Sequence, residues 1–513
     1  MSQGHKEGTE PVLFLPGTDV YRHVKKTDFY ERLSAALDLS FVRELTKPLY
    51  ADGIGRPSLD PVVFFKCMLI AFFENITYDT NLEYRIADSL AFHRFLDYGL
   101  DERTPDESTL RKTRQKMPQE AFDTVFDYVL GLCDQHGLLK GRAVGTDSTL
   151  VDANASMDSL THKELGCSYE DFMLALRRQD DPDATKSEAA QADSKRKAKA
   201  SNHDWESATD SDSRIMQHSD GHTHLSYKID TTVDLETGVI VSTGADHANV
   251  SDQTDCLQRI DEATDQLAEH GKEVQAVVAD KGHHSGVNLA GLNERGLIGL
   301  ISSPSPGKKN PGFERSDFTY DEAKDCYVCP AGHILTRRVR KDTEIRFYQA
   351  KGSACCKCPH FRTCTECKSG RSLSVSIHEE LIAANRARVH SDEARPLMQI
   401  RRQRGEAPFG YFKFFGGMRR MSGRGLGFAQ KKAQCAGIGW NLLLLMKHLA
   451  AQPMDESILV VISLLLRLTG RLQTLCRRIL GSLSIAEFNT LGSHPAVEFV
   501  LKTRRKTCLS GGC

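Results

Sequence analysis

Basic residues gather in one stretch of the chain, residues 395–424, around a single acidic residue, Glu406. The stretch carries a local charge of +7, whereas the whole 513-residue chain has a net charge of −1. A surface segment normally mixes charges of both signs, so this excess of cations predicts a polyanionic partner. A carboxylate among cations does not help to bind phosphate, but it can hold a metal ion beside one. The eight basic residues are Arg395, Arg401, Arg402, Arg404, Lys413, Arg419, Arg420 and Arg424.

The spacing of Arg402, Glu406 and Lys413 would place the three side chains on one face of a helix. At about 100° per residue, separations of four and seven residues keep them within about 40° of one another. Pro408 would clash with the carbonyl of Arg404 inside a regular helix, so we expect a kink or a helix restart there. The same pattern also fits a solvated basic helix in which Glu406 is only a salt-bridge partner.

Two aspartates lie in predicted strands, where aspartate is depleted. Asp147 lies in the half-apolar, β-branched run of residues 141–156, and Asp280 ends the short buried strand of residues 273–280. The carboxyl ends of strands are where α/β sheets place chemistry, which makes Asp280 a candidate for a functional role. Asp147 also fits the alternative of a purely structural hydrogen-bonding residue.

The predicted elements around these residues indicate a mixed sheet with helices packed on it. Residues 1–140 are mainly helical in pattern, which suits a DNA-binding module, a dimerisation surface or a plain bundle. The polar, low-apolar segment 160–202 predicts a mobile loop or an exposed helix. The histidines that follow it have metal-binding side chains but no regular ligand spacing, which favours a loop. These histidines are His218, His222 and His224.

Seven of the fifteen cysteines lie between Cys326 and Cys367, and this clustering indicates a metal site rather than a disulfide framework. CxxC turns about 26 residues apart match a structural zinc ribbon, in which thiolates surround Zn²⁺. Reduced free thiols are the alternative. The cysteines that we expect to bind structural Zn²⁺ are Cys329, Cys355, Cys358 and Cys364, with Cys326 and Cys367 as alternates.

The composition is that of an ordinary globular chain, with 40% hydrophobic and 26% charged residues. The polar N-terminus does not resemble a signal peptide. The longest apolar run, residues 458–466, is much shorter than the ~20 residues of a membrane span. We therefore expect a cytoplasmic protein without a membrane partner.

Taken together, Asp147, Asp280 and Glu406 resemble the acidic triad of the DDE transposases of bacterial insertion sequences. The spacing Arg402-x3-Glu406-x6-Lys413 resembles the Tyr-Arg-Glu-Lys signature of one large subgroup, although Gln399 stands where that signature has tyrosine. The other similar segments are VGTDSTLVDANAS, ADKGHHSG, RGLGFAQKKAQ and the late Asn441.

Two further regions extend the resemblance, which runs from about residue 50 to about residue 450. The motifs GRPSLDP and TPDESTL resemble the helical N-terminal domain of the same elements, and the Cys segment resembles a Cys-rich insertion of one branch. The resemblance implies an α/β fold: a ribonuclease-H-like mixed sheet core with a helical N-terminal domain and a Cys-rich, zinc-ribbon-like insertion.

This family resemblance also implies a division of the chain into five parts. They are a helical N-terminal domain for DNA-end binding or dimerisation (1–140), the first part of the catalytic core (141–304), the Cys-rich insertion (305–372), the completion of the core with the Glu406 helix (373–450) and a helical C-terminal extension (451–513).

The implied mechanism uses Asp147, Asp280 and Glu406 to hold two Mg²⁺ (or Mn²⁺) ions ~3.5–4 Å apart. One ion would activate water and later a DNA 3′-hydroxyl, and the other would stabilise the leaving oxygen. Arg402 and Lys413 would hold phosphates beside the scissile bond. The residues expected to supply salt-dependent affinity for the DNA backbone are Arg401, Arg404, Arg419, Arg420 and Arg424.

The sequence thus predicts a metal-dependent transposase that acts at the bacterial nucleoid. Its partners would be double-stranded DNA, both the terminal inverted repeats of its element and the target, and further copies of itself in a homo-oligomer. Two alternatives remain open. One is a zinc-ribbon DNA-binding regulator without catalysis, and the other is a domesticated ribonuclease-H-like nuclease that cuts DNA but does not join strands.

Overall fold

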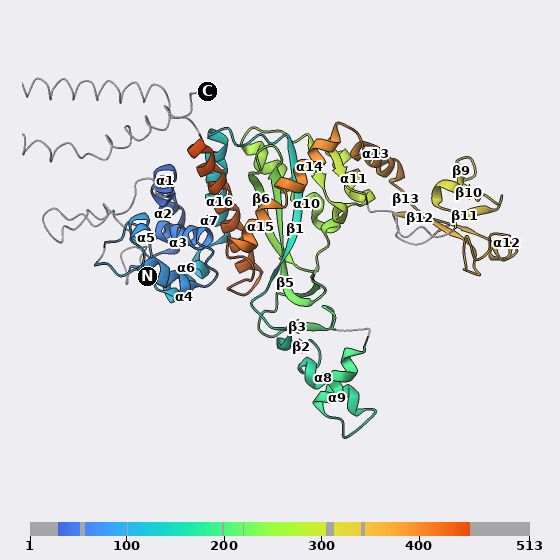
Figure 1. Cartoon of the computed structure of the whole chain (residues 1–513), viewed down its shortest axis with the longest axis horizontal. Helices are drawn as coiled ribbons and strands as arrows, with labels where there is room; N and C mark the ends of the chain where they lie inside the picture. The colour runs from blue at the N-terminus through green and yellow to red at the C-terminus, as the bar shows by residue number, and fades with distance from the viewer. Residues whose placement is uncertain are drawn as a thin grey trace, which may run out of the picture. The chain divides into compact units, whose positions relative to one another are not determined.

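The computed structural model describes most of the chain (Figure 1). The described residues are 29–51, 57–99, 101–196, 200–218, 220–303, 312–339 and 344–451. The predicted helical C-terminal extension lies outside them except for Ala451. Within these ranges, no helix is both long and apolar enough to cross a membrane.

The N-terminal region is a set of short helices around one apolar helix, α3 (Pro61–Phe73), which is buried over nearly all of its length. The Asp60 carboxylate begins this helix by accepting the Val62 N–H at 2.9 Å. The Arg43 guanidinium donates to the same carboxylate at 2.8 Å, so the helix cap also ties α2 to α3. The other helices are α1 (Phe29–Ala36), α2 (Phe41–Thr46), η2 (Lys47–Leu49), α4 (Asp79–Ala87), α5 (Leu90–Phe95), α6 (Glu107–Lys116) and α7 (Gln119–Gln135).

The centre of the chain is a six-stranded mixed sheet, which confirms the predicted mixed α/β architecture. The strand order is β4-β5-β1-β7-β8, and β6 also pairs with β5. β1 is antiparallel to β5 and parallel to β7, and β7 is parallel to β8. The strands are β1 (Ala143–Asp152), β4 (Arg214–Gln217), β5 (Thr223–Asp234), β6 (Ile240–His247), β7 (Ala276–Ala279) and β8 (Ile298–Ile301).

Helices that follow the strands β5 and β6 along the chain pack on the sheet (Figure 1). α10 contacts β1, β5 and β6, α14 contacts β7, and α11 and α13 contact β8. These helices are α10 (Asp252–Glu269), α11 (Gly286–Glu294), α13 (Glu379–Val389), α14 (Ala394–Arg404), α15 (Ala407–Phe414) and α16 (Leu426–Ala451).

Two fully buried asparagines each form hydrogen bonds with one backbone position on an edge strand of this sheet. The Asn441 side chain of α16 accepts the Ile240 N–H and donates to the Ile240 carbonyl, both at 2.8 Å. The Asn385 side chain of α13 makes the same pair of bonds with Ile301, at 3.1 and 2.7 Å. Each amide therefore satisfies one backbone N–H and one carbonyl of an edge strand, as a neighbouring strand would at that residue.

An arm of the chain follows β1. The segment predicted as a mobile loop or exposed helix contains two helices, α8 and α9, and α9 begins with a capping box formed by Thr185 and Glu188. A two-stranded sheet, β2 with β3, holds the base of the arm. The elements are η3 (Met157–Ser159), β2 (Leu160–His162), α8 (Tyr169–Arg178), α9 (Lys186–Ser194) and β3 (Trp205–Ser207).

The Cys-rich segment forms a separate antiparallel sheet of five strands in the order β13-β12-β11-β10-β9. It has its own apolar cluster, which includes Phe318, Tyr327, Leu335 and Tyr348. The elements are η5 (Arg315–Asp317), β9 (Thr319–Asp321), β10 (Cys326–Val328), β11 (Ile334–Arg338), β12 (Ile345–Ala350), α12 (Gly352–Cys356) and β13 (Ser372–Ser376).

The helix restart predicted at Pro408 is confirmed. α14 ends at Arg404, and α15 begins at Ala407 with Pro408 in its first turn. Gly405 and Glu406 have backbone dihedral angles of the α-helical region, although neither residue belongs to α14 or α15. Glu406 is thus the residue at the junction of two helices rather than a position inside one.

We expect each of the variants Asn441→Ala and Asn385→Ala to lower the free energy of unfolding by about 2–4 kcal/mol, because each leaves a buried N–H and a buried carbonyl unpaired. Denaturant unfolding of the full chain measures this loss. Asn293→Ala, at an exposed position of α11, is the control. Equal stability of all three variants would contradict the proposed role of these amides.

Candidate active site

Asp147 and Asp280 lie next to each other at the central sheet. In the parallel pairing of β1 with β7, Thr146 lies opposite Ala279. Asp147 is the next residue of β1, and Asp280 directly follows the last residue of β7. The two carboxylates are close enough to repel each other, and this repulsion helps to raise the pKa of Asp147. The structure therefore brings together two members of the predicted triad, 133 residues apart in sequence.

Arg401 of α14 provides the charge that balances Asp147. Its Nη2 donates to Asp147 Oδ2 at 2.7 Å, and both side chains are largely buried. Burial is the main cause that raises the pKa of Asp147, and the neighbouring guanidinium opposes it. The other carboxylate oxygen accepts the Ser148 N–H at 2.9 Å. Arg401, predicted to contact DNA, thus has an ionic partner inside the protein.

Asp280 is fixed by the short helix η4 (Lys281–His283) that follows it. Its Oδ1 accepts the Gly282 N–H at 2.8 Å and lies 2.9 Å from Nδ1 of the buried His283. The hydrogen bond from His283 is the main reason that the pKa of Asp280 is lowered. The carboxylate is therefore ionised and oriented, as a metal ligand must be.

A third aspartate, Asp252 in the first turn of α10, was not predicted and lies beside Asp280. A Cβ placed on Gly282 would lie 3.0 Å from Asp252 Oδ2 and 3.0 Å from Asp280 Oδ1, so the glycine permits the two carboxylates to approach. The Ser148 hydroxyl donates to Asp252 Oδ1 at 2.8 Å, which links it to β1. From the sequence, Asp252 had only the signature of a first-turn residue after the N-cap Ser251.

Glu406 is exposed, and among the described residues its side chain makes no ion pair or hydrogen bond. The contacts of the structure join Asp147 to Asp280 but do not join Glu406 to either of them. Glu406 follows Arg401 by five residues of helical backbone, a rise of about 7–8 Å along the axis. Its carboxylate is therefore carried by the segment that contacts Asp147, but it points into solvent.

The basic residues predicted to bind DNA differ in their exposure and in their contacts within the protein. Arg404 donates to the Leu235 carbonyl at 2.6 Å, and Arg420 donates to the carbonyls of Ala153 and Ala155 at 3.1 Å each. Lys413 is half-buried, and burial lowers its pKa. The side chains of the remaining three are exposed: Arg402, Arg419 and Arg424.

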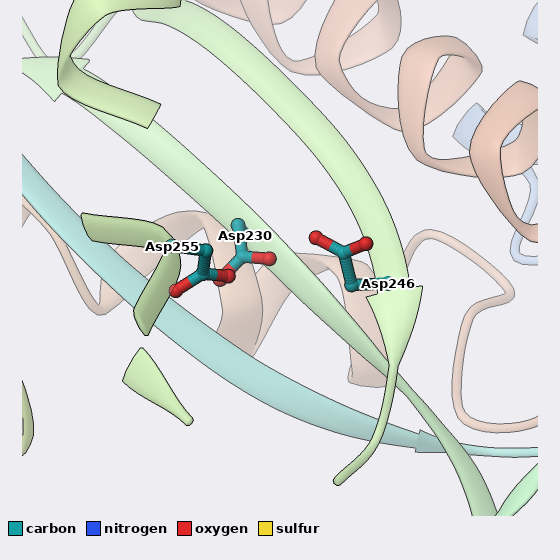
Figure 2. Close-up of side chains that lie close together, drawn as sticks. All are labelled: Asp230, Asp246 and Asp255. Atoms are coloured by element: carbon teal, nitrogen blue, oxygen red, sulfur yellow. The ribbon is translucent and has the colours of Figure 1, made fainter. Parts of the chain in front are cut away.

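Figure 2 shows a second acidic group, Asp230, Asp246 and Asp255, whose carboxylate oxygens lie within 4.8 Å of one another. Two basic side chains form ion pairs with this group. Lys228 contacts Asp255 and lies 3.3 Å from Asp230, and Arg259 contacts Asp246. Lys228 also lies 3.4 Å from Asp252. The group is therefore best described as a buried ionic network that supports Asp252, because Lys228 and Arg259 pair with its carboxylates.

The Cys-rich segment brings the four expected zinc ligands to one small cavity. Cys329, Cys355, Cys358 and Cys364 line it together with His333 and His360. The His333 N–H points at Cys329 Sγ (3.2 Å) and the Arg371 N–H at Cys355 Sγ (3.4 Å). Burial raises the pKa of Cys364, and the other three thiols add to the rise.

The alternate cysteines are not among the residues that line this cavity. Cys326 is buried in β10, where it pairs with Thr336 and Asp321 across the sheet. Cys367 is exposed, and its sulfur lies 2.9 Å from the Ser369 hydroxyl.

Two family descriptions match separate parts of the chain. Residues 18–116 match the transposase domain DUF772, and residues 328–446 match the transposase DDE domain DDE_Tnp_1_6. The matches support a DDE transposase. The match to the transposase DDE domain includes the four cavity cysteines and Glu406, whereas Asp147 and Asp280 precede it.

No curated protein matches the chain. The cryo-EM structure of the piggyBac transposase synaptic complex with hairpin DNA is a structural neighbour, with 11% sequence identity, a TM-score of 0.26, and coverage of 84% of this chain and 77% of that chain.

We expect Asp230 to make the stability of the protein fall as pH rises from about 4 to about 7. Burial raises the pKa of Asp230 from 3.8 to about 7, so the folded protein keeps a proton that the unfolded chain releases. As pH rises, the free energy of unfolding of the wild type should therefore fall relative to that of Asp230→Asn, by up to about 1.4 kcal/mol per pH unit. Denaturant unfolding between pH 5 and 8 measures it.

Asp265→Asn, at an exposed position of α10, is the matched control and should show a constant difference from the wild type. A constant difference for Asp230→Asn as well would show that Asp230 ionises at an ordinary pH.

Proposed function

We propose that the chain is a metal-dependent DDE transposase of the Tyr-Arg-Glu-Lys class, from the branch with a Cys-rich insertion. It would bind the terminal inverted repeats of its element, hydrolyse phosphodiester bonds there and join the ends to target DNA. The register of β1 and β7, which makes Asp147 and Asp280 neighbours, is the observation that carries this proposal. The strand order around β1 supports a ribonuclease-H-like core.

The residues present fit a hard divalent cation. Carboxylate oxygens are the ligands that Mg²⁺ and Mn²⁺ prefer, and Asp280 is held ionised by His283. The proposed ligands are Asp147 and Asp280, with Glu406 carried over from the family resemblance. When bound, the ions would activate the attacking hydroxyl and stabilise the leaving oxygen.

The protein side of this mechanism is positioning. His283 and the Gly282 N–H orient Asp280, and the Ser148 N–H and Arg401 orient Asp147. Arg401 also opposes the rise in the pKa of Asp147 that burial causes, because a guanidinium remains charged at all relevant pH values. Asp252 lines the same edge and would bind a metal-bound water or the ion itself.

The exposed cations are the proposed contacts to DNA. Arg402, Arg419 and Arg424 have no ion-pair partner among the described residues, so they are available to neutralise phosphates. Lys413 would join them at the α15 end of the site. The internal contacts of Arg401 and Arg404 favour structural roles for these two residues.

We expect Asp147→Asn and Asp280→Asn each to reduce Mg²⁺-dependent cleavage by about 100-fold or more, since each removes a carboxylate ligand. The assay uses full-length protein and a duplex made from the DNA that flanks the gene, including its inverted repeats. Glu406→Gln should have the same effect. Asp265→Asn is the control that should cleave like the wild type.

Each outcome separates the alternatives. Full cleavage by the Asp147 and Asp280 variants would favour the alternative in which the chain is a DNA-binding regulator without catalysis. Loss of activity in Asp252→Asn with full activity in Glu406→Gln would replace Glu406 by Asp252 as the third ligand. Cleavage without joining of a pre-cut 3′-hydroxyl end would indicate a nuclease rather than a transposase.

We also propose that Cys329, Cys355, Cys358 and Cys364 bind one structural Zn²⁺. The donor set supports this, because four sulfurs line one cavity and two of them face backbone N–H groups, which stabilise thiolates. A closed site of four thiolates contributes folding energy and leaves no position for substrate.

We expect Cys358→Ser to lose one zinc ion per chain and to melt at a lower temperature than the wild type, because the metal holds the cavity together. Metal analysis and thermal unfolding of the purified protein measure these effects. Cys367→Ser is the matched control, as an exposed cysteine of the same segment. Zinc-free wild-type protein with freely titratable thiols would refute the site.

The remaining expectations follow from this activity. The enzyme would act in the cytoplasm at the bacterial nucleoid, and it would pair two element ends as a homo-oligomer with double-stranded DNA as its only substrate.

A further inference from the structure

Two adjacent phenylalanines at the end of α15, Phe414 and Phe415, keep most of their surface in solvent. They are 66% and 59% exposed, and no other phenylalanine of the described residues is exposed. Two neighbouring aromatic rings in water forgo the free energy that their burial would supply. A contiguous exposed apolar patch, unlike a single apolar side chain, commonly marks an interaction site.

The pair has a rigid support. The Phe415 N–H donates to the Tyr411 carbonyl at 2.7 Å, and the rings of these two residues are 5.5 Å apart between centroids. The Tyr411 ring packs in turn against Phe72 of α3 and Trp440 of α16, at 5.4 and 5.6 Å. Because three helices fix the ring behind Phe415, a ligand that binds there orders little of the protein.

The turn that follows the pair is also held in place. Gly417 has a positive φ of 65°, which glycine adopts without strain, and its N–H donates to Asn75 Oδ1 at 2.9 Å. The Met418 N–H then donates to the Phe412 carbonyl at 3.0 Å. This bond folds the chain back, so that the exposed Arg419 returns toward the end of α15.

The sequence around the pair is cationic. Lys413 precedes it, Arg419 and Arg420 follow, and Glu406 is the single acidic residue of the whole basic stretch 395–424. Such a surface attracts a polyanion. A second copy of this chain fits less well, because an interface of two-fold symmetry would bring these cations close to their own equivalents.

The length of α15 places the pair near the candidate active site. Phe414 follows Glu406 by eight residues of mostly helical backbone, a rise of about 12 Å. Successive nucleotides of a DNA strand are about 3.4 Å apart, so this rise corresponds to about three or four nucleotides. The rings would therefore meet DNA a short way along the strand from a phosphate held beside Glu406.

We propose that Phe414 and Phe415 form a stacking platform for unpaired bases of the DNA strand whose phosphates the neighbouring cations hold. This inference rests on the proposed function, which supplies DNA as the ligand. Aromatic rings stack on the face of any base, so the platform recognises single-stranded character rather than sequence. In a fully paired duplex the bases already stack on one another, and the platform gains nothing from them.

The test measures equilibrium DNA binding by full-length protein without added divalent ions, so that no cleavage occurs. The two probes are a blunt duplex and the same duplex with a single-stranded extension of thymines. We expect Phe414→Ala/Phe415→Ala to weaken binding of the extended duplex about 5–100-fold and to leave binding of the blunt duplex unchanged. Tyr84→Ala is the matched control, because Tyr84 is an exposed aromatic residue of α4 outside the basic stretch.

Further variants separate stacking from apolar contact and from charge. Phe414→Trp/Phe415→Trp should keep the affinity of the wild type, whereas Phe414→Leu/Phe415→Leu, which is apolar but has no π face, should lose it. Arg419→Gln should weaken both probes alike and reduce the salt dependence of binding, because it acts on phosphates. All of these side chains are exposed, so the melting temperatures should stay unchanged.

Full affinity for the extended duplex in the alanine or leucine variants would overturn the proposal, as would an equal loss for both probes. If the alanine variant kept its affinity but changed from an oligomer to a monomer, the pair would be a contact between copies of the chain. The result is independent of catalysis. Cleavage by a chain whose binding ignores the pair would overturn the platform alone, and pair-dependent binding by a chain that does not cleave would support it without the transposase.

Discussion

The buried ion pair between Arg401 and Asp147 is the interaction on which the candidate active site depends. It joins residues 254 positions apart and fixes α14 against the sheet. A carboxylate in a buried strand would otherwise take up a proton, since burial disfavours its charged form. Loss of one partner of such a pair typically costs about 3–5 kcal/mol, because the other charge stays buried. The pair thus holds Asp147 in place and limits the rise in its pKa.

Charge balance continues through the layer between the sheet and α10. Lys228 forms ion pairs with Asp230, Asp252 and Asp255. Arg259 forms ion pairs with Asp230, Asp246 and Glu262. The acidic side chains near the site are therefore of two kinds. Those of the network are paired with Lys228 and Arg259, whereas Asp280 accepts a hydrogen bond from His283, which lowers its pKa. Asp280 is therefore the ionised carboxylate that fits the proposed divalent ion.

The sequence predicted the features that depend on local pattern. Pro408 marked the junction of α14 and α15. The β-branched run around Asp147 predicted a strand, and the apolar run before Asp280 predicted the strand that ends just before it. Cysteine spacing selected the four thiols that line one cavity. These properties are set by residues close in the chain, or by turn geometry, and so they are readable without coordinates.

Features that depend on tertiary approach were not predicted. Asp252 is an unremarkable helix-start residue until Gly282 brings Asp280 beside it. Arg401 and Arg402 are indistinguishable by composition, yet the first is buried against Asp147 and the second is exposed. His218 and His224 were assigned to a loop because hairpin register, which pairs residues by position rather than by spacing, is what brings their imidazole rings together.

The bonds between Asn385 and Ile301 also bear on how this chain is assembled from parts. Ile301 ends the last core strand before the Cys-rich segment, and Asn385 lies in the first core helix after it, so the chain leaves and re-enters the core within hydrogen-bonding distance. The segment between them has its own sheet and apolar cluster. Its removal would therefore leave the path of the core unchanged, because the residues at its entry and exit are already hydrogen-bonded to each other.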